Sequence, residues 1–167
     1  MKQNTHVLIA TGIISLFLSG CGFQPLYCGS PDERQDFEIH VKGDGYSTYK
    51  FRREFEKNLA YTPKFDTEKY RLDVTVTESK SAVTYRTDAS VTRNQETLAA
   101  NCLISKKGQT IATSSGSVVT SYPLTPAEEY VTRVAEDAAS NRSAIALAED
   151  ISRDVLRQIK AGNNKLN

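Results

Sequence analysis

The stretch YRLDVTVT, residues 70–77, decides the fold of this chain. Its apolar side chains stand at every second position, and charged residues or threonines stand between them. This alternation is typical of a strand with one buried and one solvated face. We therefore expect Arg71, Asp73, Thr75 and Thr77 to point away from the core.

Further strands are indicated on both sides of this stretch by alternation or by a high content of β-branched residues and tyrosine. These runs are residues 37–42, 97–105 and 110–122, and residues 81–87 continue the strand-like composition after residue 77. Lys106-Lys107-Gly108 separates the last two runs. This short polar sequence predicts a hairpin turn between two antiparallel strands.

Two segments have the periodicity of amphipathic helices. The first, residues 49–59, places three large apolar side chains four residues apart: Phe51, Phe55 and Leu59. The second covers residues 125–162 and opens with Thr125-Pro126-Ala127-Glu128, which fits a capping box with proline at the first helical position. Gly162 marks its expected end. Its expected buried stripe consists of Val134, Ala138, Ile145, Ala148, Ile151, Val155 and Ile159.

The order strand, helix, three strands, helix predicts an α+β fold. Long strands joined by short turns favour a mostly antiparallel sheet of about four strands. We expect the two helices to cover one face of this sheet in a two-layer domain and the other face to be solvated. The sequence places this single domain at residues 37–162, followed by a short tail at 163–167.

The N-terminus resembles a lipoprotein signal peptide. An apolar run at residues 7–18 follows a short charged start. As a helix it would reach about 18 Å, whereas a hydrocarbon core is about 30 Å thick. The run ends in Leu18-Ser19-Gly20-Cys21, which resembles the bacterial lipobox. We therefore predict a signal peptide at 1–20, lipidation of Cys21, and an extended tether at 21–36 that contains prolines and glycines.

The charge of the mature chain gives no general attraction to a polyanion. Loss of Lys2 with the signal peptide leaves twenty basic residues against 20 acidic ones. A neutral chain does not favour nucleic acid as a partner, so we expect none. Gly22, rather than an aspartate, follows the lipidated cysteine. By resemblance to enterobacterial lipoproteins, this favours export to the outer membrane.

The side chains with reactive chemistry form no catalytic or metal-binding constellation in the sequence. His40 is the only histidine of the mature chain, so a hydrolase with a serine or cysteine nucleophile would have to use it. No CxxC or HExxH spacing is present, and we expect no catalysis, no metal and no cofactor. Cys102 alternates with Ala100 and Ile104, as a small buried hydrophobe would. A disulfide between Cys102 and Cys28 is the open alternative.

The start of the mature chain, CGFQPLY at residues 21–27, resembles the lipopolysaccharide-assembly lipoproteins of Gram-negative bacteria, the LptE family, particularly its alphaproteobacterial type. The order of elements and the run YRLDVTV at 70–76 extend the resemblance. So does the ending, through Ser121-Tyr122, Asp137-Ala138, Arg142 and Leu147-Ala148. Cys28 is a departure, because the family usually runs from tyrosine directly to glycine.

This resemblance implies an outer-membrane lipoprotein on the periplasmic side, held in the membrane by N-terminal acyl chains. Its partners would be lipopolysaccharide and an LptD-like β-barrel, which it would plug while helping to insert lipopolysaccharide into the outer membrane. Two alternatives are an auxiliary lipoprotein of an ABC-type lipid-trafficking system and, less favoured, a periplasmic lipoprotein hydrolase that would depend on His40.

A contact site for lipopolysaccharide would need basic side chains held together without neighbouring carboxylates, because the ligand is polyanionic. Lys106 and Lys107 fit this requirement, since they are adjacent at the predicted hairpin tip and Glu96 is the nearest acidic residue in sequence. We expect Arg86 and Arg93 to lie near them. An ordinary solvated turn is the alternative interpretation of these lysines.

Overall fold

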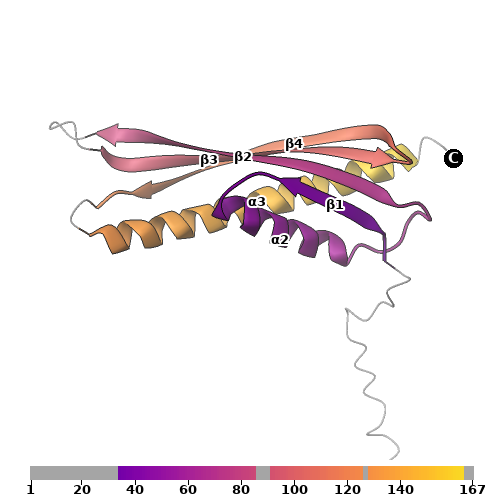
Figure 1. Cartoon of the computed structure of the whole chain (residues 1–167), viewed down its shortest axis with the longest axis horizontal. Helices are drawn as coiled ribbons and strands as arrows, with labels where there is room; N and C mark the ends of the chain where they lie inside the picture. The colour runs from indigo at the N-terminus through magenta and orange to yellow at the C-terminus, as the bar shows by residue number, and fades with distance from the viewer. Residues whose placement is uncertain (1–33, 86–90, 126–127, 164–167) are drawn as a thin grey trace, which may run out of the picture. The chain divides into compact units, whose positions relative to one another are not determined.

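Four strands form one mixed sheet in the computed structural model, which describes residues 34–85, 91–125 and 128–163 (Figure 1). The strands lie in the order β1 (Phe37–Lys42), β2 (Tyr70–Tyr85), β3 (Val91–Lys106) and β4 (Gln109–Pro123). Strand β1 pairs with β2 in parallel, and the other two pairs are antiparallel. The parallel pair follows from the helix between β1 and β2, because a parallel pair needs a crossover connection.

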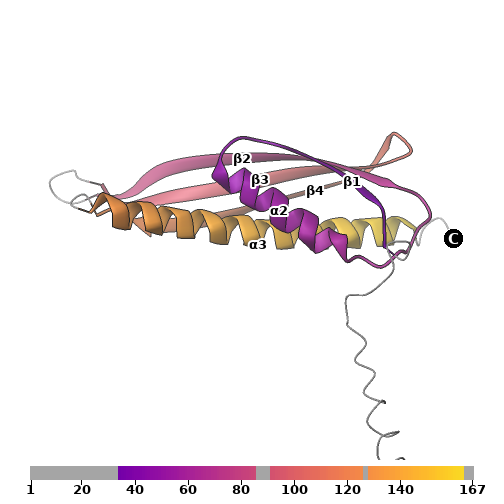
Figure 2. The ribbon, with the colours of Figure 1, turned by 60° about the horizontal axis from the view of Figure 1, so that its bottom comes forward.

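Both helices pack on the same face of the sheet (Figure 2). Helix α2 (Tyr46–Ala60) buries Phe51, Phe55 and Leu59, as predicted. Helix α3 (Glu129–Asn163) contacts β4 and β3 and also packs against α2. The structure therefore confirms the α+β fold, the order strand, helix, three strands, helix, and the two layers. No helix in the described part of the chain is long and apolar enough to cross a membrane.

The register of β2 and β3 brings the apolar sides of the two strands together. Leu72 is opposite Ile104, Val74 opposite Cys102, and Val76 opposite Ala100, and all six residues are buried. A slip of one residue would turn these side chains out of the core, so burial fixes the register. The intervening residues of all four strands form the opposite surface, which we call the open face.

Two turns depend on backbone conformations with positive φ. Lys107 (φ 52°) and Gly108 (φ 80°) form the two-residue loop between β3 and β4, as expected of a tight hairpin. Gly43 (φ 144°) lies between β1 and α2, where an added Cβ would stand 2.6 Å from the Val76 carbonyl oxygen. Only glycine allows the chain to turn this closely over β2.

The buried stripe of α3 agrees with the prediction only in the second half of the helix. Ala148, Ile151, Val155 and Ile159 are buried, as expected. The prediction was wrong upstream, where Val134 is 49% exposed, Ala138 is exposed and Ile145 is half-buried. The residues buried there instead are Ala139, Ser140, Ser143, Ala144 and Leu147. This part of α3 packs on a polar group, Glu96 of β3, through small residues.

The start of α3 also differs from the predicted capping box. The Glu128 N–H donates to the Thr125 backbone carbonyl (2.9 Å), not to its hydroxyl. The Thr125 N–H donates to the hydroxyl of Thr132 (2.9 Å), which takes the place expected for the Glu128 carboxylate. A threonine one turn into α3 therefore satisfies the donor that the sequence pattern assigned to Glu128.

The segment just before β1 takes part in the fold. Gln35 is buried, and its side chain donates to the Glu68 carbonyl (2.8 Å) and accepts from the Asp66 N–H (3.0 Å). Residues expected to be tether are therefore packed against the loop before β2.

Cys102 is a free, fully buried thiol, and burial raises its pKa to about 12. Cys21, Cys28 and Arg86 lie outside the described residues.

Candidate functional site

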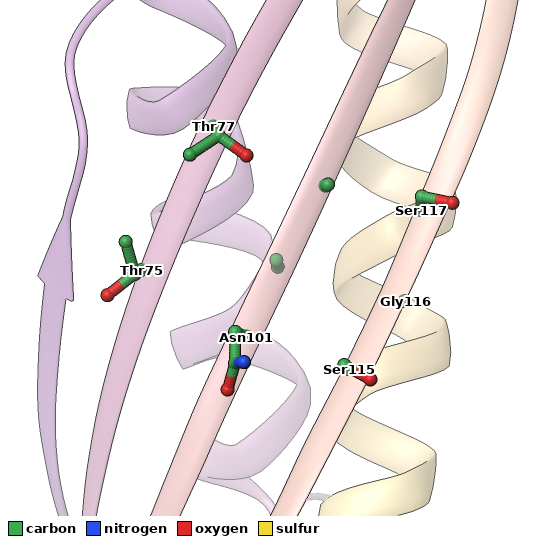
Figure 3. A pocket seen from close by; sticks show the side chains of 8 residues that line it. Thr75, Thr77, Asn101, Ser115, Gly116 and Ser117 are labelled. Carbon is green, nitrogen blue, oxygen red and sulfur yellow. The ribbon is translucent and has the colours of Figure 1, made fainter.

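The open face is the side of the sheet that the described helices leave uncovered, and small polar side chains occupy its centre (Figure 3). Strand pairing aligns them in two rows across β2, β3 and β4. The first row is Thr75, Asn101 and Ser115, and the second is Thr77, Ala99 and Ser117. Alternation along each strand places these residues opposite the buried core.

A shallow hollow of about 420 Å³ lies over these rows. It forms because the flanking side chains are short, and none of the residues that line it is ionisable. The lining offers hydroxyl and amide groups, each of which can donate and accept hydrogen bonds. The exposed large apolar side chains of the strands do not line this hollow; they are Val83, Leu103, Ile111 and Val119. Chemically, the centre of the open face suits contact with a neutral, hydrated surface.

Ion pairs stand where β1 and β2 meet on the open face. Arg71 donates to both carboxylate oxygens of Asp73 (2.9 and 3.1 Å), and these hydrogen bonds lower the pKa of Asp73. His40 Nε2 lies 2.9 Å from Glu38 Oε1, and this hydrogen bond lowers the pKa of the Glu38 carboxyl. Arg71, Asp73 and Glu38 thus each have a polar neighbour on this side, as on an ordinary solvated strand surface.

His40 is the residue on which the hydrolase alternative depends. Its partner is a carboxylate two residues away on the same strand, and both side chains are close to half exposed. Among the described residues, no group of three or more His, Cys, Asp or Glu side chains could hold a metal ion. The structure therefore supplies no observation that favours catalysis at His40.

The two lysines at the hairpin each contact a carboxylate, contrary to the prediction. Lys106 Nζ lies 2.5 Å from Asp66 Oδ2, and Lys107 Nζ lies 2.8 Å from Glu68 Oε1. The Asp66 carboxylate also accepts from the Tyr70 hydroxyl (2.5 Å). The hydrogen bond from Lys106, and then that from Tyr70, hold the pKa of Asp66 well below its usual range. The acids come from the loop before β2, which sequence distance could not place beside the hairpin.

Arg93 does not lie near the two lysines, so the expected basic cluster is wrong in this respect. Arg93 is near the start of β3, and Lys106 is its last residue. At about 3.3 Å per residue, the two positions are roughly 40 Å apart. The first and last residues of β3 lie at opposite ends of this long strand, which runs along the length of the sheet (Figure 1). Lys106 and Lys107 therefore form a separate basic site.

A buried polar cluster was not found from the sequence. The Glu96 carboxylate is fully buried and accepts from the hydroxyls of Ser140 (2.6 Å), Ser47 (3.3 Å) and Ser143 (3.4 Å). These bonds join β3 to both helices. The only sequence signal was that Glu96 shares strand parity with Leu98 and Ala100, which places it on the buried side.

Comparisons with known proteins give a fold but no family. No family model matches the sequence, and no curated protein matches it. Among solved structures, lipoprotein B from Nitrosomonas europaea is similar with a TM-score of 0.61 and 11% identity, covering 79% of this chain and 88% of that chain. The rare lipoprotein B from Shewanella oneidensis (0.54, 12%) covers 79% of this chain and 98% of that chain. A minor lipoprotein from Acinetobacter baumannii (0.57, 14%) covers 78% and 92%. The chain thus shares its fold with bacterial lipoproteins.

Proposed function

We propose that this chain is an outer-membrane lipoprotein, anchored through Cys21, that assembles with a β-barrel translocon and plugs it during lipopolysaccharide insertion. Two features support the proposal besides the sequence resemblance to the LptE family. The lipobox-like sequence ends at Cys21, and the fold is that of known bacterial lipoproteins, a rare lipoprotein B among them. The proposal assigns the chain a binding role and no catalytic step.

The observation that carries the proposal is the chemistry of the open face. The lumen of a wide membrane barrel is polar and hydrated. A plug must offer such a wall hydrogen-bonding groups and avoid large apolar patches, since these would be exposed to water. The rows through Asn101 and Ser115 provide hydroxyl and amide groups over a shallow hollow, and no large apolar side chain lines that hollow.

Lys107 is the more suitable of the two hairpin lysines for an anionic group of lipopolysaccharide. Its side chain is 71% exposed, whereas that of Lys106 is 22% exposed and contacts the Tyr70 ring as well as Asp66. Charge reversal in Lys107→Glu should therefore weaken binding of purified lipopolysaccharide more than Lys106→Met does. The binding that remains in Lys107→Glu should also depend less on the salt concentration than binding by the wild-type chain does. Arg93→Glu, at the far end of β3, tests whether a second basic position contributes. If all variants bound lipopolysaccharide at low salt with the affinity of the wild-type chain, these residues would not belong to the contact site.

Co-purification from native outer membranes separates the proposal from its alternatives. A full-length chain with a C-terminal tag should recover a large β-barrel protein in stable association. Recovery of inner-membrane permease subunits would instead support the ABC-type lipid-trafficking system. A chain that recovers neither, and whose His40→Ala variant loses a measurable hydrolytic activity, would support the hydrolase.

Cys21→Ser tests the membrane anchor directly. The variant lacks the thiol that accepts the diacylglyceryl group, and stable attachment needs at least two acyl chains. It should therefore remain uncleaved, incorporate no labelled fatty acid and fail to recover the barrel. Cys28→Ser is the matched control and should keep normal acylation. Acylation that persisted in Cys21→Ser would contradict the assignment.

A further inference from the structure

The two edges of the sheet differ in how they are protected. Strand β1 has six residues and presents Glu38, His40 and Lys42, and such short, charged edges resist pairing with other chains. Strand β4 has fifteen residues, QTIATSSGSVVTSYP, without a charged side chain, and its one proline is the last residue. Within the described residues, β4 pairs only with β3. Its outer edge therefore has no neighbouring strand and none of the charges that protect β1, although the Thr113 carbonyl accepts a hydrogen bond from Gln158 of α3.

Helix α3 runs beneath this edge and presents a row of charges there. A second hollow, of about 440 Å³, lies between the edge of β4 at residues 115–117 and the charged side of α3. Its ionisable lining residues are Asp150, Arg153, Asp154 and Arg157. Gln158 Nε2 donates to the Thr113 carbonyl (3.0 Å) and ties this part of α3 to the strand. The spacing of three and four residues places the four charges on one side of the helix.

The order of these charges is self-complementary. From residue 150 to residue 157 the charges are acid, base, acid, base. When the same row from a second copy runs in the opposite direction beside it, every acid faces a base. Two copies related by a two-fold axis would place Asp150 opposite Arg157 of the second copy, and Arg153 opposite its Asp154. The present pairs lie within the helix, and Asp150, Arg153 and Arg157 are well exposed, so these three side chains are free to exchange partners. The Asp154 carboxylate is 24% exposed and also accepts from Gln158 Nε2 (2.7 Å).

We propose that the edge of β4 pairs antiparallel with β4 of a second copy of this chain, so that the two sheets become continuous and the two α3 helices lie side by side. The axis would pass near Ser114 and Ser115. Gln158 donates to the Thr113 carbonyl, and a Cβ added at Gly116 would lie 3.3 Å from Ile151 Cδ1. The middle of the charge row is therefore opposite these serines. This surface is isologous, since the same residues serve both copies. The proposal does not depend on the proposed function.

A charge-swap series tests this interface. The full-length chain is studied by sedimentation equilibrium in a density-matched non-ionic detergent, where we expect a concentration-dependent equilibrium between monomer and dimer. Asp150→Arg and Arg157→Asp should each weaken dimerisation by about tenfold, because each replaces two symmetry-related attractions with repulsions. The double variant should restore the affinity. Positions 150 and 157 are seven residues apart, so the restoration cannot arise within one helix.

The matched control is the swap Glu129→Arg with Arg133→Glu, an exposed pair at the start of α3, which should leave dimerisation unchanged. A wild-type chain that stays monomeric up to about 100 μM, where even micromolar affinity would give dimers, would overturn the proposal. So would a double variant that dimerises as weakly as the single ones. A monomer that uses the same edge to bind a strand of another protein would also overturn it.

Discussion

Single residues show where the polar chemistry of this chain lies. Glu96 is a carboxylate without solvent contact, and burial of such a group is costly unless hydrogen bonds compensate it. Hydroxyls from Ser47, Ser140 and Ser143 provide them, so one buried acid connects three elements. Asp66 has a comparable role at the other end of the domain, where it receives hydrogen bonds from Lys106 and Tyr70. These contacts were beyond sequence reasoning because each joins residues separated by dozens of positions or by a turn of unknown path.

The pairing of Asp66 with Lys106 predicts a pH-dependent contribution to stability. The folded-state pKa of Asp66 is lowered, chiefly by the hydrogen bond from Lys106. Such a carboxylate stabilises the fold fully above its unfolded pKa of about 3.9, and the contribution is lost as the pH falls through the folded value. Lys106→Met should therefore reduce the free energy of unfolding at about pH 6, and the difference from wild type should shrink toward about pH 2.

Urea unfolding at several pH values measures this difference. Lys107→Met serves as the control, because its pair with Glu68 is more exposed and should contribute little. If the loss of unfolding free energy in Lys106→Met stayed constant from about pH 6 to pH 2, lost packing on Tyr70, rather than the charge of Asp66, would be its cause.

At the scale of elements, the sequence predicted what hydrophobic periodicity controls. Strand β1, the first half of β2, helix α2 and the second half of α3 were assigned correctly because their buried positions carry large apolar residues such as Phe51 and Ile151. The first half of α3 was assigned the wrong face, since it buries serines and alanines against Glu96 while Val134 is exposed. Periodicity of apolar residues cannot detect a helix face that packs through small polar side chains.

The second half of α3 should carry a large share of the stability. Ile151 is 1% exposed, and truncation of a buried isoleucine to alanine costs about 2–5 kcal/mol. For a domain with a total of about 5–15 kcal/mol, Ile151→Ala should move the urea midpoint strongly. Val134→Ala is the matched control and should change the free energy of unfolding by no more than about 0.5 kcal/mol. Equal effects of the two substitutions would mean that the register of α3 is wrong.

At the scale of the whole molecule, the fold places both helices on one face and leaves the other to short polar side chains. Alternation in β2 predicted half of this open face, through Thr75 and Thr77. The contributions of Asn101, Ser115 and Ser117 needed the strand register, which determines which residues of β3 and β4 lie beside them. The carboxylate partners of Lys106 and Lys107 could not be predicted for the same reason, because Asp66 and Glu68 reach the hairpin only in the folded chain.

Site-specific photo-cross-linking tests the central claim most directly. A photoreactive phenylalanine analogue at Asn101, an exposed position at the centre of the open face, should be tolerated by the fold and should cross-link to a β-barrel protein when cells are irradiated. The same probe in a Cys21→Ser chain, which lacks the anchor, should give no such product. A β-barrel cross-link at Asn101 that depends on Cys21 is the result that our account predicts. A normally anchored and folded chain that forms no β-barrel cross-link from Asn101 would contradict it.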